Sequence, residues 1–183
     1  MKVVDMRTKG TWREVADAAR TTVGMEKGER EPSSSWKKKM LLAEHSPIRK
    51  LLFCWKWVDL PYWCSVHLVR HKIGIEHWIK SQRSDRTGIP REELPQGALV
   101  THECEANAQA LITISRKRLC RQASPETRLA WTAVVAAVKS VDEAVASVCV
   151  PDCIYRGGCY EMKPCRWNET DDYNRLLEKY QLR

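Results

Sequence analysis

The sequence predicts a single α+β domain. Its 183 residues, 43% of them hydrophobic, are enough for one domain with a substantial core. Two segments, residues 2–6 and 51–60, have the composition of strands. Several longer segments carry the capping residues and the spacing that are typical of helices. The combination of short strands with longer helices predicts the mixed class.

The overall charge favours an anionic partner. Lys and Arg number 31 against 23 Asp and Glu, which gives a formal net charge of +8. A nucleotide, a folate and a nucleic acid are all anions, and the charge of the protein alone does not distinguish among them. No run approaches the roughly 18 apolar residues of a membrane span, and the first ten residues have no signal-peptide core. We therefore expect a cytoplasmic protein with no membrane partner.

The first 60 residues are expected to hold two helices between the two strands. Thr11 and Glu14 form a capping-box pattern, which predicts a helix over residues 12–21. A loop rich in Gly, Pro and Ser follows, and its serines can cap a second helix over residues 36–44. Residues 51–60, LLFCWKWVDL, fit a mostly buried strand.

Helices are expected to dominate the rest of the chain. Pro61 can serve as the first residue of a helix over residues 62–72. Ser124 and Pro125 have the residue types of an N-cap and a first helical position. The remaining expected elements run over residues 98–119, 124–148 and, as a polar terminal helix or tail, 168–183.

One stripe of the helix expected over residues 98–119 has polar ends. Asn107, Leu111, Ile114 and Arg118 are spaced 4, 3 and 4, which places them on one helix face. The two polar ends are 11 residues apart, or about 16 Å along the helix. An inward stripe with such ends needs polar partners at both. This pattern fits a helix that lies along an extended ligand.

Residues 67–86, HLVRHKIGIEHWIKSQRSDR, mix cationic with large apolar side chains. The mixture predicts a semi-buried anion site, with arginines for phosphate and an apolar wall for a planar ring. The alternative is an amphipathic helix end with a basic solvent face. His67, Arg70 and His71 stand at i, i+3 and i+4, so a helix here places them on one face.

A set of polar motifs follows a fixed order along the chain. It comprises a His-Ser-Pro element, a basic triplet, a serine–arginine element, an arginine before Leu-Pro, and the polar stripe described above. The motifs are His45-Ser46-Pro47, Arg70-His71-Lys72, Ser81-Gln82-Arg83, Arg91 with Leu94-Pro95, and Asn107 with Thr113 and Arg118.

Together these motifs resemble the signature of the flavin-dependent thymidylate synthases. The spacing from Arg91 to Asn107, and from there to Arg118, matches that family without a gap. The resemblance covers roughly residues 14–130. It implies the mixed helix and sheet fold of that family, assembled as a homotetramer whose flavin and nucleotide sites are built from several subunits.

The resemblance also implies a reaction and its cofactors. The reaction is transfer of a one-carbon unit to C5 of a pyrimidine deoxynucleoside monophosphate, by default dUMP to dTMP. The family uses FAD, with NADPH as reductant and methylenetetrahydrofolate as the one-carbon donor. No nucleic acid is an obligatory partner in such a reaction.

Site residues carry over from the same resemblance. Arg118 is the implied catalytic residue, and it polarises the pyrimidine ring by stabilising charge that develops there. The implied FAD-binding residues are His45, Ser46, Arg70, His71, Lys72, Asn107 and Thr113, and the implied nucleotide-binding residues are His67, Arg70, Ser81, Gln82, Arg83, Arg91 and Arg118.

The sequence departs from the family pattern in four ways. Lys72 replaces an arginine and lacks its planar fork, and Thr113 replaces an asparagine. An Asn-Glu pair is replaced within residues 77–80, and only seven residues separate Arg83 from Arg91, where relatives have a long insertion. These changes leave dCMP as substrate, or a hydroxymethyl product, open. The rival interpretation is a non-catalytic protein that binds nucleic acid or metal on the same fold.

Four of the eight cysteines cluster beyond the resemblance. Cys149, Cys153, Cys159 and Cys165 lie within 17 residues, and four thiolates can form a tetrahedral zinc site. Their spacing lacks the CxxC knuckle, so reduced thiols that pack a loop-rich tail are the alternative. We expect residues 1–148 to form the synthase-like domain and residues 149–183 a Cys-rich extension.

Overall fold

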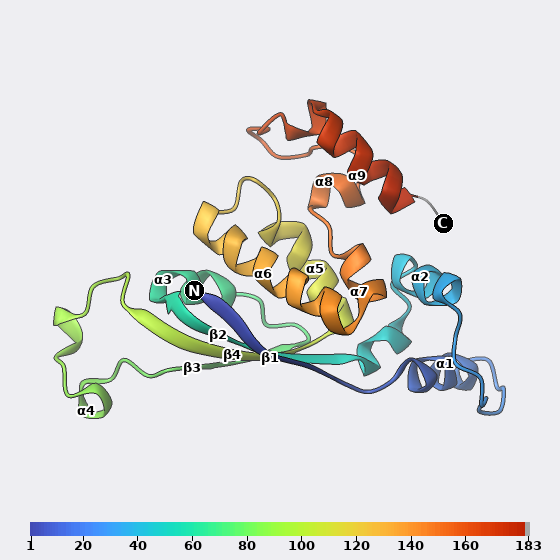
Figure 1. The fold of residues 1–183 in the computed structure, drawn as a ribbon, viewed down its shortest axis with the longest axis horizontal. Helices are drawn as coiled ribbons and strands as arrows, with labels where there is room; N and C mark the ends of the chain where they lie inside the picture. Colours follow the sequence, from blue (N-terminus) through green and yellow to red (C-terminus); the bar gives the residue numbers. More distant parts are fainter. Residues whose placement is uncertain (182–183) are drawn as a thin grey trace.

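The computed structural model, which describes residues 1–181, has a four-stranded antiparallel sheet with helices on one face (Figure 1). The strand order is β1-β2-β4-β3, so the second strand of the chain pairs with the fourth. This confirms the mixed helix and sheet class. The strands are β1 (Lys2–Lys9), β2 (Leu52–Pro61), β3 (Ile75–Ile79) and β4 (Leu99–Asn107).

The helices form two layers above the sheet (Figure 1). α5, α6 and α7 pack on the sheet, and α8 and α9 lie above them. The helices are α1 (Trp12–Thr21), α2 (Ser34–Leu42), α3 (Tyr62–Leu68), α4 (Ser84–Thr87), α5 (Ala108–Arg118), α6 (Pro125–Val141), α7 (Glu143–Val148), α8 (Asp152–Tyr155) and α9 (Asp171–Gln181), with short 3-10 turns η1 (Ser46–Lys50), η2 (Arg91–Glu93) and η3 (Trp167–Glu169).

Three tryptophans join the sheet to the helical layer. Trp55 and Trp57 on β2 meet edge to face at 5.4 Å, and Trp131 of α6 lies 5.9 and 6.3 Å from them. Two of the three indole nitrogens bind helix groups, since Trp131 Nε1 donates to Ser115 Oγ (2.9 Å) and Trp57 Nε1 to the Ala130 carbonyl (3.1 Å). Such aromatic pairs add about 0.5–1.5 kcal/mol each beyond the area they bury. The cluster therefore fixes α5 and α6 on the sheet.

Three expected helices differ from the structure. Residues 99–107 form a strand rather than the first half of a helix, and α5 begins only after Asn107. The helix expected over 62–72 ends at Leu68. The helix expected over 124–148 is interrupted at Asp142, whose extended backbone (φ −152°) ends α6 while its carboxylate caps α7.

The chain between β3 and β4 projects from the end of the sheet as an arm that carries α4 (Figure 1). We call residues 80–98 the arm. Its two ends are tied to the fold by backbone hydrogen bonds, from Lys80 N to Thr101 O and from Tyr62 N to Ala98 O, both 2.9 Å. Most arm side chains are exposed. The expectation of a semi-buried site along residues 67–86 is thus wrong for the arm within one protomer.

The C-terminal segment has a small hydrophobic cluster of its own. Val150, Ile154 and Tyr173 are its buried members, and Tyr180 of α9 packs against both this cluster and the main core. The expected terminal helix is confirmed as α9, and residues 182–183 lie outside the described residues. Within the described chain, no helix has the length and apolar character needed to cross a membrane.

Candidate functional site

Arg118 is the last residue of α5, and its side chain is fixed against the segment that ends α3. Its Nε donates to His71 Nε2 (2.7 Å), and its Nη2 donates to the His67 carbonyl oxygen (2.6 Å). Burial lowers the pKa of Arg118, and the neighbouring Arg70 lowers it further. The guanidinium has five N–H donors, and these two contacts orient it while using only two of them.

His71 supports Arg118 as a neutral acceptor. Burial lowers the pKa of His71 to about 4, and electrostatic interactions with the nearby Arg118, His77 and Arg70 act in the same direction. Because Nε2 accepts from Arg118, the hydrogen-bond network assigns the ring proton to Nδ1. The two residues therefore form a pair in which the imidazole orients the guanidinium.

The low pKa of His71 makes stability depend on pH. The folded ring stays neutral down to about pH 4, whereas the unfolded chain takes up a proton near its ordinary pKa of 6.5. The contribution is complete above about pH 6.5 and is lost as the pH falls toward 4. It amounts to at most about 3 kcal/mol, and less once solvent screens the half-buried ring.

We therefore expect His71→Gln to flatten the fall in unfolding free energy between about pH 7 and pH 4.5, measured by urea denaturation. His45→Gln changes an exposed histidine and is the matched control. Equal slopes for wild type and His71→Gln would contradict the assignment.

Two further histidines, which the sequence did not single out, hold the His71 turn in place. His77 Nε2 donates to the His71 carbonyl (2.8 Å), and His77 Nδ1 lies 2.9 Å from His102 Nε2. His102 Nδ1 in turn lies 3.2 Å from Ser65 Oγ. Because a carbonyl can only accept, the proton of His77 lies on Nε2, and His77 Nδ1 is an acceptor. His102 therefore donates from Nε2 to His77 Nδ1, and Ser65 Oγ donates to His102 Nδ1. Each ring nitrogen thus has a partner.

Cys104 completes this cluster, with Sγ 3.2 and 3.3 Å from the facing nitrogens of His77 and His102. Among the described residues, His77, His102 and Cys104 are the set of three potential metal ligands whose donor atoms all lie within 4.8 Å of one another. Burial lowers the pKa of His102 to about 3. Because the ring nitrogens are satisfied without an ion, we interpret the cluster as a hydrogen-bonded chain that anchors the His71 turn.

Asn107 and Thr113 differ in their surroundings. Asn107 is the N-cap of α5, and its Oδ1 accepts from Ala110 N (2.9 Å). It packs against Gly74, where φ is +74° and an added Cβ would lie 2.6 Å from Asn107 Nδ2.

Leu111 and Ile114, between Asn107 and Arg118, are buried, so the stripe faces inward as expected. Thr113 is exposed, and its hydroxyl donates to its own helix.

Four other predicted FAD residues lie on the surface. Arg70 and Lys72 are exposed on either side of His71, and the adjacent Ile73 has 93% of its surface open. His45 and Ser46 are exposed at the start of η1, and the side chain of His45 makes no cap hydrogen bond. His67, predicted for the nucleotide, turns its ring toward Thr127 (3.1 Å) and offers Arg118 only its carbonyl.

The predicted phosphate-binding residues all lie on the arm. Arg83 is 62% exposed and forms a bidentate pair with Asp85 (both 2.9 Å). Ser81 Oγ accepts from Arg83 N (3.2 Å), Gln82 is half-buried, and Arg91 is exposed with its backbone N–H bound to Ser84. Within the described protomer, these contacts stay on the arm, whereas those of Arg118 go to His71 and to the His67 carbonyl.

Solved structures with the same arrangement identify the fold. A flavin-dependent thymidylate synthase ThyX from Helicobacter pylori, solved with FAD and dUMP, superposes with a TM-score of 0.68 at 13% identity, over 82% of this chain and 100% of that chain. A second structure of that enzyme with FAD and dUMP, at 2.31 Å resolution, also gives 0.68 at 13% identity, over 82% and 99%. The fold is that of the flavin-dependent thymidylate synthases.

A UMP/dUMP methylase, PolB from Streptomyces cacaoi bound with 5-Br dUMP, shares this flavin-dependent thymidylate synthase fold. Its TM-score is 0.64 at 15% identity, over 80% of this chain and 92% of that chain. No protein-family model matches the sequence, and no curated relative matches it.

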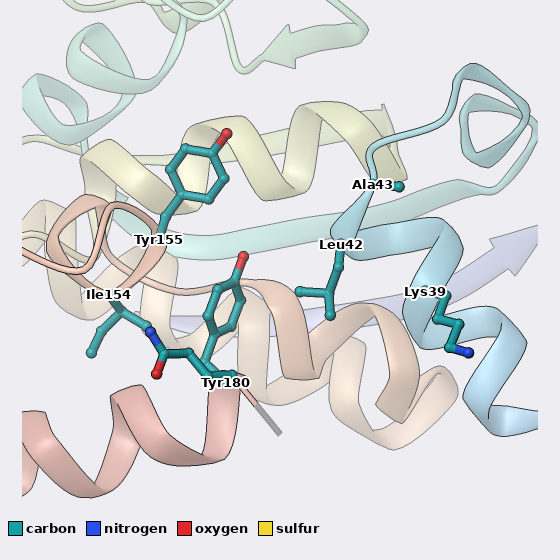
Figure 2. Close-up of a pocket in the computed structure, with 7 residues that line it drawn as sticks. Lys39, Leu42, Ala43, Ile154, Tyr155 and Tyr180 are labelled. Carbon is teal, nitrogen blue, oxygen red and sulfur yellow. The ribbon is translucent and has the colours of Figure 1, made fainter. Parts of the chain in front are cut away.

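A cavity of ≈ 700 Å³ lies elsewhere on this thymidylate synthase-type fold. Figure 2 shows Lys39, Leu42 and Ala43 at the end of α2 on one side, with Ile154, Tyr155 and Tyr180 of the C-terminal segment on the other. Its volume is within the range of ligand pockets. None of the predicted FAD or nucleotide residues lines it.

Cys149 is separated from the other cysteines of the C-terminal cluster. It is buried in the main core, where burial raises its pKa to about 12 and a hydrogen bond with Ser115 opposes that rise. Cys153, Cys159 and Cys165 lie around a different cavity, described below. The structure thus brings together three of the four residues of the predicted metal site.

Proposed function

We propose that this chain is a flavin-dependent enzyme that transfers a one-carbon unit to C5 of a pyrimidine deoxynucleoside monophosphate, with dUMP as the default substrate. The observation that carries the proposal is Arg118, which is half-buried at the end of an inward stripe and held by His71 and the His67 carbonyl. A non-catalytic scaffold has no need to fix a cation in this way. The fold supports the same choice of chemistry.

The residues on the His71 turn fit FAD. Arg70 and Lys72 are exposed cations suited to a pyrophosphate, and the exposed Ile73 offers apolar surface to a planar ring. Asn107 adds an amide beside Gly74. His45, Ser46 and Thr113 would extend the site. When bound, the flavin supplies the redox chemistry of the transfer, with NADPH as reductant and methylenetetrahydrofolate as the one-carbon donor.

The chain's own contribution to the chemistry is electrostatic. Arg118 stabilises negative charge that develops on the pyrimidine ring as C5 becomes nucleophilic. His71 remains neutral at pH 7 and keeps the guanidinium in position without competing for the substrate's charge. Arg70 is close enough to lower the pKa of both residues, so it adds positive potential for an anionic substrate.

The nucleotide site is proposed to be shared between protomers of a homotetramer. Arg83, Arg91, Ser81 and Gln82 project on the arm, where serine hydroxyl and guanidinium groups suit a 5′-phosphate. Figure 1 shows the arm projecting away from α5, the helix that ends at Arg118, and this arrangement fits insertion of the arm into a neighbouring site. We place the reaction in the cytoplasm.

The decisive experiment is the visible absorption spectrum of the purified protein with and without added FAD. We expect flavin absorption that NADPH bleaches and that returns when folate and nucleotide are present. Comparing dUMP with dCMP, and identifying the product by mass, then distinguishes the substrate and separates a methyl from a hydroxymethyl group. A protein that stays colourless with FAD would favour the binding-protein alternative.

A further inference from the structure

A small cavity beneath the C-terminal segment is surrounded by sulfur. Its volume is ≈ 20 Å³, which is enough for a single water-sized occupant. Half of the chain's eight cysteines line it, and all four are free thiols. They are Cys120, Cys153, Cys159 and Cys165.

These cysteines come from three separate segments. Cys120 lies two residues after the end of α5, Cys153 lies in α8, and Cys159 and Cys165 lie in the irregular loop that follows α8. Cys120 is therefore distant in sequence from the other three, and no spacing motif could have joined it to them. Their closeness is independently visible in the pKa of Cys120, which burial raises first and which Cys165 and Cys159 raise further.

A polar atom at the same cavity has no partner in the protein. Asn168 lines the cavity, and its side-chain Oδ1 is fully buried without a hydrogen bond. A buried acceptor left unpaired costs about 1–3 kcal/mol, so such atoms usually face a ligand or an ordered water. Arg121 also lines the cavity, and its guanidinium lies 5.2 Å from the Trp167 ring.

The C-terminal segment has too little core to hold its own loop. Its hydrophobic cluster has three buried residues, Val150, Ile154 and Tyr173. The loop over residues 156–166 is mostly exposed, with Met162 fully so. Modules below about 40 residues usually need disulfides, a metal or association with another chain.

We propose that Cys120, Cys153, Cys159 and Cys165 bind one Zn²⁺ as a tetrahedral thiolate site that fastens the C-terminal segment to the end of α5. The four thiols release four protons when they coordinate the ion. Zn²⁺ with four neutral thiols has a total charge of +2, whereas Zn²⁺ with four thiolates has a total charge of −2. Among the described residues that line the cavity, Arg121 supplies a positive charge that offsets part of this negative charge.

Binding requires the four sulfur atoms to draw together. In the described residues only the His77–His102–Cys104 cluster has its donor atoms within 4.8 Å of one another. Rotation about the single χ1 torsion moves a cysteine sulfur by about 3 Å, which suffices to converge on a cavity of this size. Cys149 is excluded as a ligand because it packs in the main core and does not line this cavity.

The test measures metal in the full chain and does not depend on enzymatic activity. Protein expressed with added zinc should contain about one zinc per chain. Replacement by Co²⁺ should give visible d–d bands and a near-ultraviolet thiolate charge-transfer band. Zinc far below one per chain, together with no cobalt spectrum, would overturn the proposal even if every cysteine variant failed to fold.

Two variants decide which cysteine is the fourth ligand. Cys120→Ser should lower bound zinc at least about tenfold, whereas Cys149→Ala should keep the wild-type content. Circular dichroism confirms that each variant folds. Normal zinc content in Cys120→Ser with loss of zinc in Cys149→Ala would overturn the assignment. So would an intact mass that is lower by four hydrogens, because it would show that the four cysteines form two disulfides.

Discussion

Arg118→Ala should lower kcat/KM for the pyrimidine substrate by about 10²–10³-fold, because one fixed cation is lost where charge develops in the transition state. The fold should survive, since the guanidinium contacts His71 and one backbone carbonyl at the edge of the core. Arg118→Lys should recover little, because an ammonium cannot make both contacts in the planar geometry of the guanidinium. Single-turnover product formation with reduced flavin measures the effect directly.

Lys117→Ala is the matched control for this prediction. Lys117 is the preceding residue of α5, is exposed, and forms a long ion pair with Asp152 (3.8 Å). Exposed pairs of this kind contribute about 0–1 kcal/mol, so activity should be unchanged. Wild-type turnover in a folded Arg118→Ala protein would remove Arg118 from the mechanism.

The starts of helices could be predicted because their signals are local. The capping box of Thr11 and Glu14 is present in both directions, with backbone and side-chain partners as expected. Ser33 and Ser124 likewise accept from backbone N–H groups three residues on. In each case all the information lies within four residues, so no tertiary contact can hide it.

The strand β4 was harder to predict because two periodicities overlap in it. Val100, His102, Cys104 and Ala106 are buried and alternate with more exposed residues, which is the period of a strand. The spacing from Asn107 to Arg118 is helical, and extending that helix backwards conceals the alternation. Asn107 marks the change, since it ends β4 and caps α5.

Clusters formed between distant segments could not be predicted from spacing. His77 meets His102 because β3 pairs with β4, a register in which His77 faces Cys104. Cys120 joins the C-terminal cysteines because α8 packs on α5. The family resemblance supplied Arg118 and His71 instead, and the structure brings these two into direct contact.

The position of the arm makes a second large effect testable. If the site takes Arg118 from one protomer and Arg91 from another, two impaired variants should partly restore each other at a nucleotide concentration too low to saturate Arg91→Ala. Arg91→Ala alone should weaken nucleotide binding by about 10–100-fold, as expected for loss of a charge-assisted hydrogen bond. Co-expressed with Arg118→Ala, it should give up to about one quarter of wild-type activity, because about one shared site in four receives both native residues.

Arg91→Ala mixed with Arg83→Ala is the control for this complementation. Both residues lie on the same arm, so no single arm in the mixture carries both arginines, and activity should stay low. Equal activity in the two mixtures, or none in the first despite mixed oligomers, would place Arg91 outside the neighbour's site. Suppose that activity recovers in the mixture of Arg91→Ala with Arg118→Ala but not in the control mixture. The arm must then reach across protomers, because a site built within one protomer would always lack either Arg91 or Arg118.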